Sequence, residues 1–271
     1  MSRRAARVRD IEMAYDESGD GTPVVLLHGF PFNRSMWRGQ AEALGATFRV
    51  VAPDLRGQGE TPLGEASGAV TMEQMASDVA ALLDELNVGR AVVGGLSMGG
   101  YVALAFRRVF PERVRALVLA DTRAGADTDD ARRTREETAK RALAEGMEPI
   151  ADAMLPKLLS GETRAQRPDV VERVRAMMLA TNPAGAAAAL RGMAQRRDQT
   201  NLLEEIAVPT LIVVGRDDAV TPPAEAEAMR DRVAGSRLVV VEGAGHLSNV
   251  ERPEEFNLAL VDFLRGLTGR R

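Results

Sequence analysis

The chain has 271 residues, of which 45% are hydrophobic and 27% are charged, a composition typical of a globular protein with a large core. Its formal net charge of -4 argues against a general nucleic-acid binder, because such proteins normally carry a basic excess. The absence of cysteine excludes disulfides, a thiolate nucleophile and a Cys-ligated metal.

The first ten residues are basic, with arginine at positions 3, 4, 7 and 9. No apolar stretch long enough for a signal peptide or a membrane span follows them. We therefore expect a cytoplasmic protein that has neither a membrane nor a nucleic acid as its partner. Residues 7–16 predict an N-terminal hairpin.

Short runs rich in β-branched residues then recur, and helical patterns follow them. The runs occupy residues 24–27, 48–52, 91–94, 114–120, 210–214 and 237–241. Continuous apolar strands that alternate with helices are typical of a parallel sheet covered on both faces. The sequence therefore predicts an α/β fold, with its site at the carboxyl ends of the strands.

Two helices can be placed from their spacing and end signals. Apolar residues repeat at helical spacing through residues 72–86, directly after Thr71, which forms a capping box with Gln74. Pro253 marks the start of a C-terminal helix with one apolar face. We interpret the first helix as scaffold.

Residues 123–199 break the alternation of strands and helices. They carry helical patterns split at Pro149, Pro168 and Pro183, and an alanine-rich stretch that also favours helix. We interpret this segment as a helical cap inserted into a core made of residues 1–122 and 200–271. Its methionines suit core filling, and their flexibility also suits an adaptable apolar pocket.

The strongest chemical signal is the sequence Gly-Leu-Ser-Met-Gly at residues 95–99, between a predicted strand and a predicted helix. A sharp turn at this junction forces the serine into strained backbone angles, and the flanking glycines avoid Cβ collisions. The turn would present the Ser97 hydroxyl at a helix N-terminus, where developing negative charge is favoured. Ser97 is therefore the candidate nucleophile.

A serine nucleophile needs a base, and the chain contains two histidines. His246 lies in a glycine-rich loop after the last predicted strand and can fold back over Ser97, so we predict that it is the base. His28 follows the first core strand, in the turn expected to supply part of an oxyanion hole, and an orienting role is favoured for it. The hole should comprise the backbone N–H groups of Phe30 and Met98.

The base in turn needs an acid that orients it. Asp217 and Asp218 follow the strand at residues 210–214, which gives the chain order Ser, Asp, His of this arrangement. Asp121, at the end of another strand, could also reach the histidine loop. The residues alone leave all three carboxylates open, since a capping or turn role explains any one of them.

Five stretches together carry a resemblance to a known family. They are residues 28–31 (HGFP), 54–59 (DLRGQG), 95–100 (GLSMGG), 215–222 (GRDDAVTP) and 245–251 (GHLSNVE). The chain resembles α/β-hydrolases, and among them 3-oxoadipate enol-lactonases and small bacterial carboxylesterases. This implies a mostly parallel central sheet of about eight strands flanked by helices, with an inserted helical cap. It also implies that Asp218 is the acid and that residues 54–59 brace the sheet.

The resemblance implies a serine hydrolase that cleaves carboxylic esters or lactones of small to medium acyl size through an acyl-enzyme. Enol-lactonases have an Asn-Ser-Leu turn where this chain has His28-Gly29-Phe30, the commoner form in esterases, so the expected substrate is an ester-like bond in general. Haloalkane dehalogenases and epoxide hydrolases use an aspartate nucleophile and are set aside. An N-acyl homoserine lactone lactonase, a carbon–carbon bond hydrolase, a cofactor-free perhydrolase and a ligand-binding receptor remain alternatives.

The expected partner is a small-molecule ester or lactone, and the chain is expected to be a monomer or a homodimer. No cofactor and no metal are expected, because both histidines have other roles and no carboxylate–histidine cluster shows ligand spacing. The residues predicted to line an apolar substrate pocket are His28, Phe32, Trp37, Met154, Met177 and Leu247.

Overall fold

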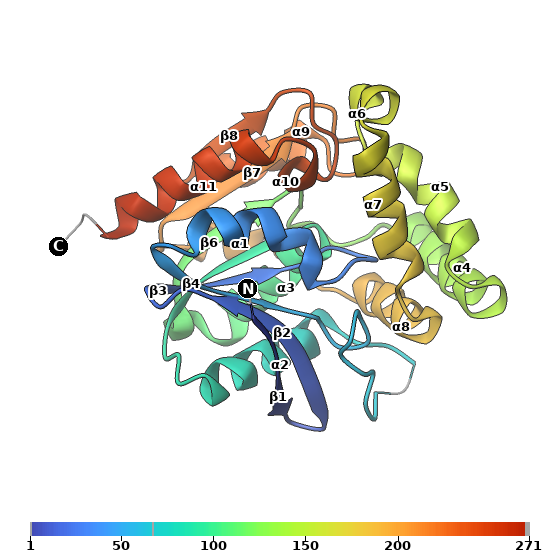
Figure 1. Cartoon of the computed structure of the whole chain (residues 1–271), viewed down its shortest axis with the longest axis horizontal. Helices are drawn as coiled ribbons and strands as arrows, with labels where there is room; N and C mark the ends of the chain where they lie inside the picture. The colour runs from blue at the N-terminus through green and yellow to red at the C-terminus, as the bar shows by residue number, and fades with distance from the viewer. Residues whose placement is uncertain (1, 67, 269–271) are drawn as a thin grey trace.

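The computed structural model describes residues 2–66 and 68–268, so that residues 1, 67 and 269–271 of the predicted core lie outside it. Its centre is one eight-stranded sheet of order β1-β2-β4-β3-β5-β6-β7-β8 (Figure 1). The strands are β1 (Ser2–Val8), β2 (Ile11–Ser18), β3 (Thr22–Leu27), β4 (Phe48–Pro53), β5 (Ala91–Leu96), β6 (Val114–Ala120), β7 (Thr210–Gly215) and β8 (Arg237–Val241).

Strand pairing agrees with the predicted architecture. β1 and β2 form the expected antiparallel hairpin, in which Val8 pairs with Ile11, and β2 joins β4 antiparallel. From β4 to β8 every pairing is parallel. The prediction of a mostly parallel α/β sheet is confirmed, and the carboxyl ends of the parallel strands meet at one edge.

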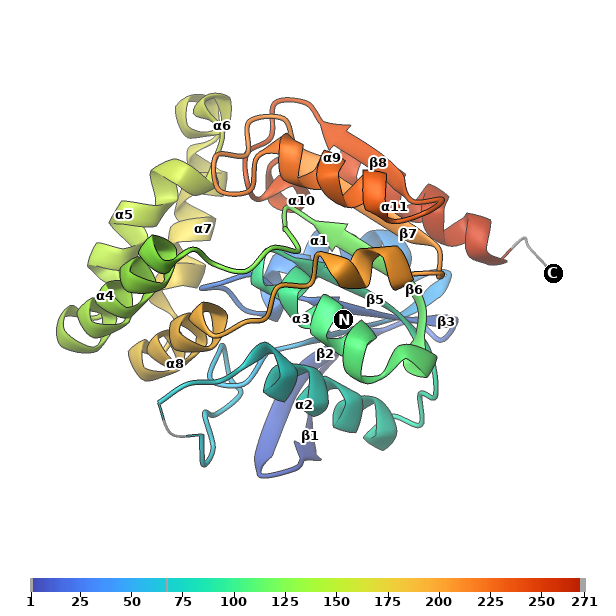
Figure 2. The ribbon, with the colours of Figure 1, turned by 180° about the vertical axis from the view of Figure 1, so that it is seen from behind.

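Helices cover both faces of this sheet. The helices of the core are α1 (Arg38–Leu44), α2 (Met72–Glu85), α3 (Met98–Val109), α9 (Pro223–Arg232), α10 (Ser248–Glu251) and α11 (Pro253–Thr268). Figure 1 shows α1 and α11 in front of the sheet, and Figure 2 shows α2, α3 and α9 on its opposite face. The strand β3 serves both layers, because Val25 and Leu27 join one apolar cluster while Val24 and Leu26 join the other.

Between β6 and β7 the described chain is helical and forms no strand. Its helices are α4 (Asp129–Glu145), α5 (Glu148–Leu158), α6 (Gly161–Gln166), α7 (Pro168–Leu179) and α8 (Pro183–Ala194). The three prolines that divided the sequence pattern lie in the first turns of α5, α7 and α8, where a missing N–H costs least. Both views place these helices at one end of the sheet. We propose that residues 123–199 are the cap.

Two details of this segment differ from what its pattern suggests. The short helix α6 is capped by Ser160, which accepts a hydrogen bond from the Thr163 N–H, a signal too local to stand out in the sequence. Pro156 lies inside α5 and does not end it. Within residues 2–66 and 68–268, no helix has both the length and the apolarity to cross a membrane.

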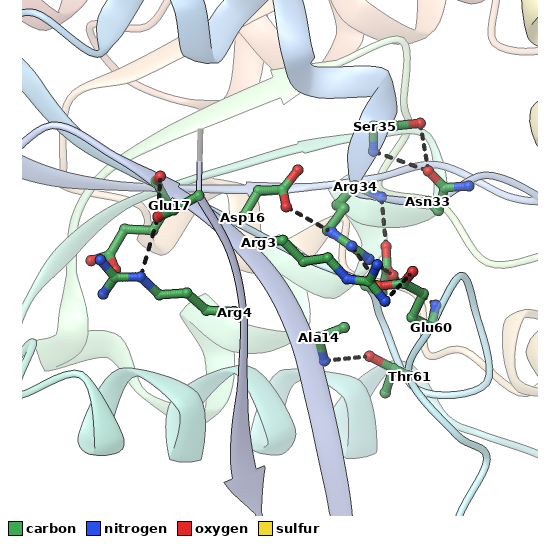
Figure 3. Close-up of polar contacts among 12 residues, drawn as sticks. Arg3, Arg4, Ala14, Asp16, Glu17, Asn33, Arg34, Ser35, Glu60 and Thr61 are labelled. Atoms are coloured by element: carbon green, nitrogen blue, oxygen red, sulfur yellow. Dashed lines mark hydrogen bonds and ion pairs between the residues drawn. The ribbon is translucent and has the colours of Figure 1, made fainter.

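An ion-pair cluster fixes the edge hairpin to the turn after β4 (Figure 3). The Arg34 guanidinium reaches Asp16 (3.0 Å) and Glu60 (2.6 Å) and also pairs with the fully buried Asp54. Asp54 further accepts the backbone N–H groups of Arg34 (2.7 Å) and Glu60 (2.8 Å). A buried charge with this many partners is well compensated, so the arrangement agrees with a bracing role for residues 54–59.

Candidate active site

The turn after β5 has the strained geometry that its sequence predicts. Ser97 adopts φ 54° and ψ -114° as the residue that precedes α3. A Cβ on Gly95 would lie 2.1 Å from the Gly99 carbonyl carbon, and one on Gly99 would lie 2.0 Å from the Leu27 oxygen. Both glycines are therefore required by close backbone approach. The neighbouring strand β6 holds the Ser97 backbone in this strained conformation, because Ala120 O accepts the Ser97 N–H at 2.9 Å.

Three predicted residues, one from each of three loops, meet at this turn. The Ser97 Oγ lies 2.8 Å from His246 Nε2, and His246 Nδ1 lies 2.8 Å from Asp218 Oδ2. His246 and Asp218 are buried, whereas Ser97 is partly exposed. This continuous hydrogen-bonded chain has the geometry that a serine nucleophile, its base and an orienting acid require.

Asp218 is held as a carboxylate by the loop that carries it. It accepts the N–H groups of Val220 (2.8 Å) and Thr221 (2.9 Å) and the Thr221 hydroxyl (2.7 Å). Burial alone would raise the pKa of Asp218, but the hydrogen bond with His246, the His246 charge and the Thr221 bonds outweigh it and lower that pKa. Asp218 therefore stays charged at neutral pH.

The other two candidate carboxylates do not contact His246. Asp217 is exposed, and its backbone N–H donates to Ala244 O. Asp121 is fully buried and accepts the Gly215 N–H (2.8 Å) and the Ser248 hydroxyl, so it braces the loops that carry Asp218 and His246. Burial and then the negative charge of Asp218 raise the pKa of Asp121 well above its ordinary value.

The histidine loop is also tied to the cap. The His246 N–H donates to Leu158 O at the end of α5 (2.9 Å). The Glu251 carboxylate accepts two backbone N–H groups, that of Gly245 in the loop and that of Ser160 in the cap, each at 2.8 Å. Sequence reasoning assigned no role to Glu251, because nothing local shows that a buried acid will meet residues of the cap.

The turn after β3 offers a second part of the predicted oxyanion hole. Within the described residues, neither the Phe30 nor the Met98 backbone N–H donates a hydrogen bond, so both are available. His28 is fully buried beneath this turn: Leu55 N–H donates to its Nε2 (3.0 Å), and its Nδ1 contacts Gly29 O (2.9 Å). Burial lowers the pKa of His28, in keeping with a neutral ring that orients the turn.

Comparison with known proteins decides the family. A family model described as the alpha/beta hydrolase fold matches residues 22–253. The chain belongs to the α/β-hydrolase family. The structure is similar to that of a thermophilic esterase from Thermogutta terrifontis, with 44% identity, coverage of 98% of this chain and 99% of that one, and a TM-score of 0.94.

Two further relatives of this α/β-hydrolase are enol-lactonases. The enzyme from Burkholderia xenovorans LB400 is 31% identical, with 97% of this chain and 100% of that one covered and a TM-score of 0.90. 3-Oxoadipate enol-lactonase 2 of Acinetobacter baylyi is 29% identical over 93% of this chain and 92% of its own length. The expected resemblance and the enzyme class, an ester or lactone hydrolase, are confirmed.

The hydrolase has a cavity of about 550 Å³ beside the turn after β3, which contributes Phe30 to its wall. Its wall includes Phe30, Arg123, Asp127, Arg135, Ile150, Met154, Lys157 and Leu190. The wall is therefore partly apolar, as predicted, and also strongly cationic, which was not predicted. Among the described residues, no three carboxylate or imidazole side chains gather where they could hold a metal ion.

The predicted pocket residues are placed differently from the expectation, Met154 excepted. Phe32, Trp37 and Leu247 are buried in one apolar cluster, in which the centroids of the Trp37 and Phe256 rings lie 6.0 Å apart. Met177 lines a separate hollow of about 230 Å³. His28 also packs inward. Large apolar side chains next to a site motif are drawn into the core, because burial there removes more apolar area from water.

Proposed function

We propose that the hydrolase cleaves carboxylic esters or lactones of small to medium acyl size through an acyl-enzyme at Ser97. The observation that carries this proposal is the pair of 2.8 Å contacts that link Ser97 Oγ, the two nitrogens of His246 and Asp218 Oδ2. The similarity to an esterase and to enol-lactonases supports an ester-like carbonyl as the reacting group.

In the proposed reaction, His246 Nδ1–H donates to Asp218, which leaves Nε2 free to accept the Ser97 proton. The Ser97 oxygen attacks the carbonyl carbon, and the developing oxyanion accepts hydrogen bonds from the N–H groups of Phe30 and Met98. The imidazolium then returns its proton to the leaving alcohol as the ester bond breaks. Water, activated by the same base, hydrolyses the acyl-enzyme and regenerates the serine.

Loss of the nucleophile tests this mechanism. With p-nitrophenyl butyrate, Ser97→Ala should lower kcat by roughly 10⁶-fold, because the acyl-enzyme cannot form without the nucleophile. Ser236→Ala is a matched control, since this hydroxyl bonds only to the nearby Arg230 carbonyl in the described structure. Retention of full activity in Ser97→Ala would contradict the proposal.

The substrate class is tested with a panel assayed beside Ser97→Ala. It should comprise p-nitrophenyl esters of increasing acyl length, N-acyl homoserine lactones, simple lactones, and hydrogen peroxide with a carboxylic acid. We expect a maximum at short to medium acyl chains. Equal activity with p-nitrophenyl esters of all acyl lengths would contradict the proposed preference for small to medium acyl groups. Activity only with hydrogen peroxide and an acid would indicate a perhydrolase. Binding of these compounds without turnover would indicate a receptor.

A further inference from the structure

Thr221 lies in the loop that carries Asp218, and it donates two hydrogen bonds to that one carboxylate. Its backbone N–H donates to Asp218 Oδ1 at 2.9 Å, and its hydroxyl donates to Asp218 Oδ2 at 2.7 Å. The Val220 N–H also donates to Oδ1, at 2.8 Å. Because both oxygens are held from the same loop, the carboxylate cannot rotate about its Cβ–Cγ bond without breaking hydrogen bonds.

The Thr221 hydroxyl also lies beside the imidazole of His246. The Thr221 Oγ1 is 3.3 Å from His246 Nδ1, whereas Asp218 Oδ2 is 2.8 Å from the same nitrogen. A hydroxyl has one proton to donate, and the shorter of its two contacts, 2.7 Å against 3.3 Å, assigns that proton to Asp218. Thr221 Oγ1 therefore presents a lone pair to His246 Nδ1.

This assignment determines which nitrogen of the neutral His246 ring carries the proton. Among the described residues, the two oxygens in contact with Nδ1 are those of Asp218 and Thr221, and both act as acceptors. Two acceptors at Nδ1 place the single ring proton there. Nε2, which lies 2.8 Å from Ser97 Oγ, is then unprotonated and can accept the serine proton.

The chain around Thr221 fixes the position of its hydroxyl. The residue is 1% exposed, so its side chain is shielded from solvent. It precedes Pro222, which favours an extended backbone at the residue before it. The branched Cβ of threonine also restricts rotation about χ1. The hydroxyl is therefore held in the orientation that it needs to donate to Asp218.

We propose that Thr221 is a positioning residue for the reaction at Ser97. It acts through Asp218, whose carboxylate it orients toward His246, and it keeps the ring proton of His246 on Nδ1. This inference rests on the proposed function, because the attack of Ser97 is the step that needs an unprotonated Nε2. Thr221 does not line the 550 Å³ cavity, so its loss should affect kcat more than KM.

The test replaces Thr221 by valine, which keeps the branched shape but removes the hydroxyl. With p-nitrophenyl butyrate, Thr221→Val should lower kcat by roughly tenfold and change KM by less than about twofold. The acidic limb of the pH profile of kcat/KM should move to higher pH. The reason is that Asp218 Oδ2, without the hydroxyl bond, keeps more negative charge toward the ring and favours the imidazolium. Thr221→Ser retains the hydroxyl and should restore both kcat and the profile.

Thr210→Val is the matched control, because Thr210 is also buried and lies at the amino end of β7, where its hydroxyl donates to Val208 O at 3.0 Å. It should leave kcat and the pH profile unchanged. A second comparison adds Thr221→Val to Asp218→Asn, in which the carboxylate is already lost. There the loss in kcat should be less than about twofold, because Thr221 acts through that carboxylate.

Thermal unfolding should show that Thr221→Val is folded at the assay temperature. If it is not, Thr221→Ala compared with Thr221→Ser provides the same test, and the alanine variant should show the loss and the pH shift. Equal kcat and equal pH profiles in Thr221→Val and Thr210→Val would overturn the role of Thr221 alone. A tenfold loss that persists in the Asp218→Asn background would do so as well. Undiminished turnover by Ser97→Ala would instead contradict the proposed function.

Discussion

The loops that carry Ser97 and His246 are bonded to each other but are held in place in different ways. The serine turn is fixed by its own glycines and by adjacent strand β6, through Ala120 O and the Thr122 hydroxyl. The histidine loop is fixed by the nearby Glu251, by Asp121 from the end of β6 and by the cap through Leu158 O. The serine turn therefore depends on its own glycines and on the neighbouring strands of the sheet, whereas the histidine loop also depends on the helices between β6 and β7.

This difference has a mechanical consequence. A displacement of α5 would pull on the His246 N–H and on Ser160, while the serine turn would keep its backbone contacts with the sheet. Changes in the cap should therefore alter the position of the base more than that of the nucleophile. The following substitutions test this asymmetry, from the largest expected effect to the smallest.

The largest effect is expected at the acid. Asp218→Asn should lower kcat by about 10⁴-fold, because an amide favours the wrong tautomer of His246 and does not stabilise the imidazolium. Asp217→Asn, at the exposed neighbouring position, should stay within about twofold of the wild type. Steady-state kinetics with p-nitrophenyl butyrate measures both. A larger loss in Asp217→Asn than in Asp218→Asn would reassign the acid.

The sequence predicts the serine turn better than it predicts the histidine loop. The strand, turn and helix around Ser97 follow from periodicity and two glycines, since the pattern that encodes these elements lies within one short segment. The choice of Asp218 needed resemblance, because Asp217 and Asp218 are equivalent in local pattern, and only the structure shows that Asp218 is buried and bonded to His246. The main strands and most cap helices were also predicted, because local patterns indicate them. These patterns are the periodic spacing of apolar residues and the prolines at helix starts.

The remaining features depend on contacts between distant segments. The pairing of Glu251 with Ser160 joins residues 91 positions apart, and the bond between Asp121 and Gly215 joins residues 94 apart. No local spacing encodes such contacts. The same reason explains the pocket: Phe32 and Trp37 were assigned to it because they are close in sequence to the turn after β3, but both side chains are buried in an apolar cluster of the core.

An intermediate effect is expected at Glu251, a positioning residue that acts through Gly245. In Glu251→Gln one backbone N–H would face an amide NH₂ group, so the loop should shift and kcat should fall by about tenfold to a hundredfold. KM should change less, because Glu251 does not line the cavity. The exposed Glu254→Gln is the control.

A structural role alone would give a different result for Glu251→Gln. Thermal unfolding and far-UV circular dichroism should show that the variant is folded at the assay temperature, so that the loss of kcat reports the position of His246. The pH profile of kcat/KM should also change, because the imidazole would no longer hold the same distance to Asp218. An unchanged profile and an unchanged kcat in a folded variant would show that the cap does not position the base.

The smallest effect is expected at Asp121, and it concerns stability. Burial and the Asp218 charge raise its pKa in the folded protein. The folded state therefore binds this proton more tightly than the unfolded state, and the wild-type free energy of unfolding loses this contribution as pH rises from below about 4 through the folded pKa. Asparagine keeps an acceptor for the Gly215 N–H but cannot ionise, so the loss is absent in Asp121→Asn.

The stability of Asp121→Asn relative to the wild type should consequently improve with rising pH, by about 1 kcal/mol for each unit by which the pKa is raised. Urea unfolding of both proteins at several pH values between about 4 and 8 measures this difference. Asp217→Asn should show no such trend, because its side chain is exposed. A constant difference across the pH range would mean that Asp121 braces the histidine loop as an ordinary carboxylate, and that its charge beside Asp218 costs the folded protein nothing.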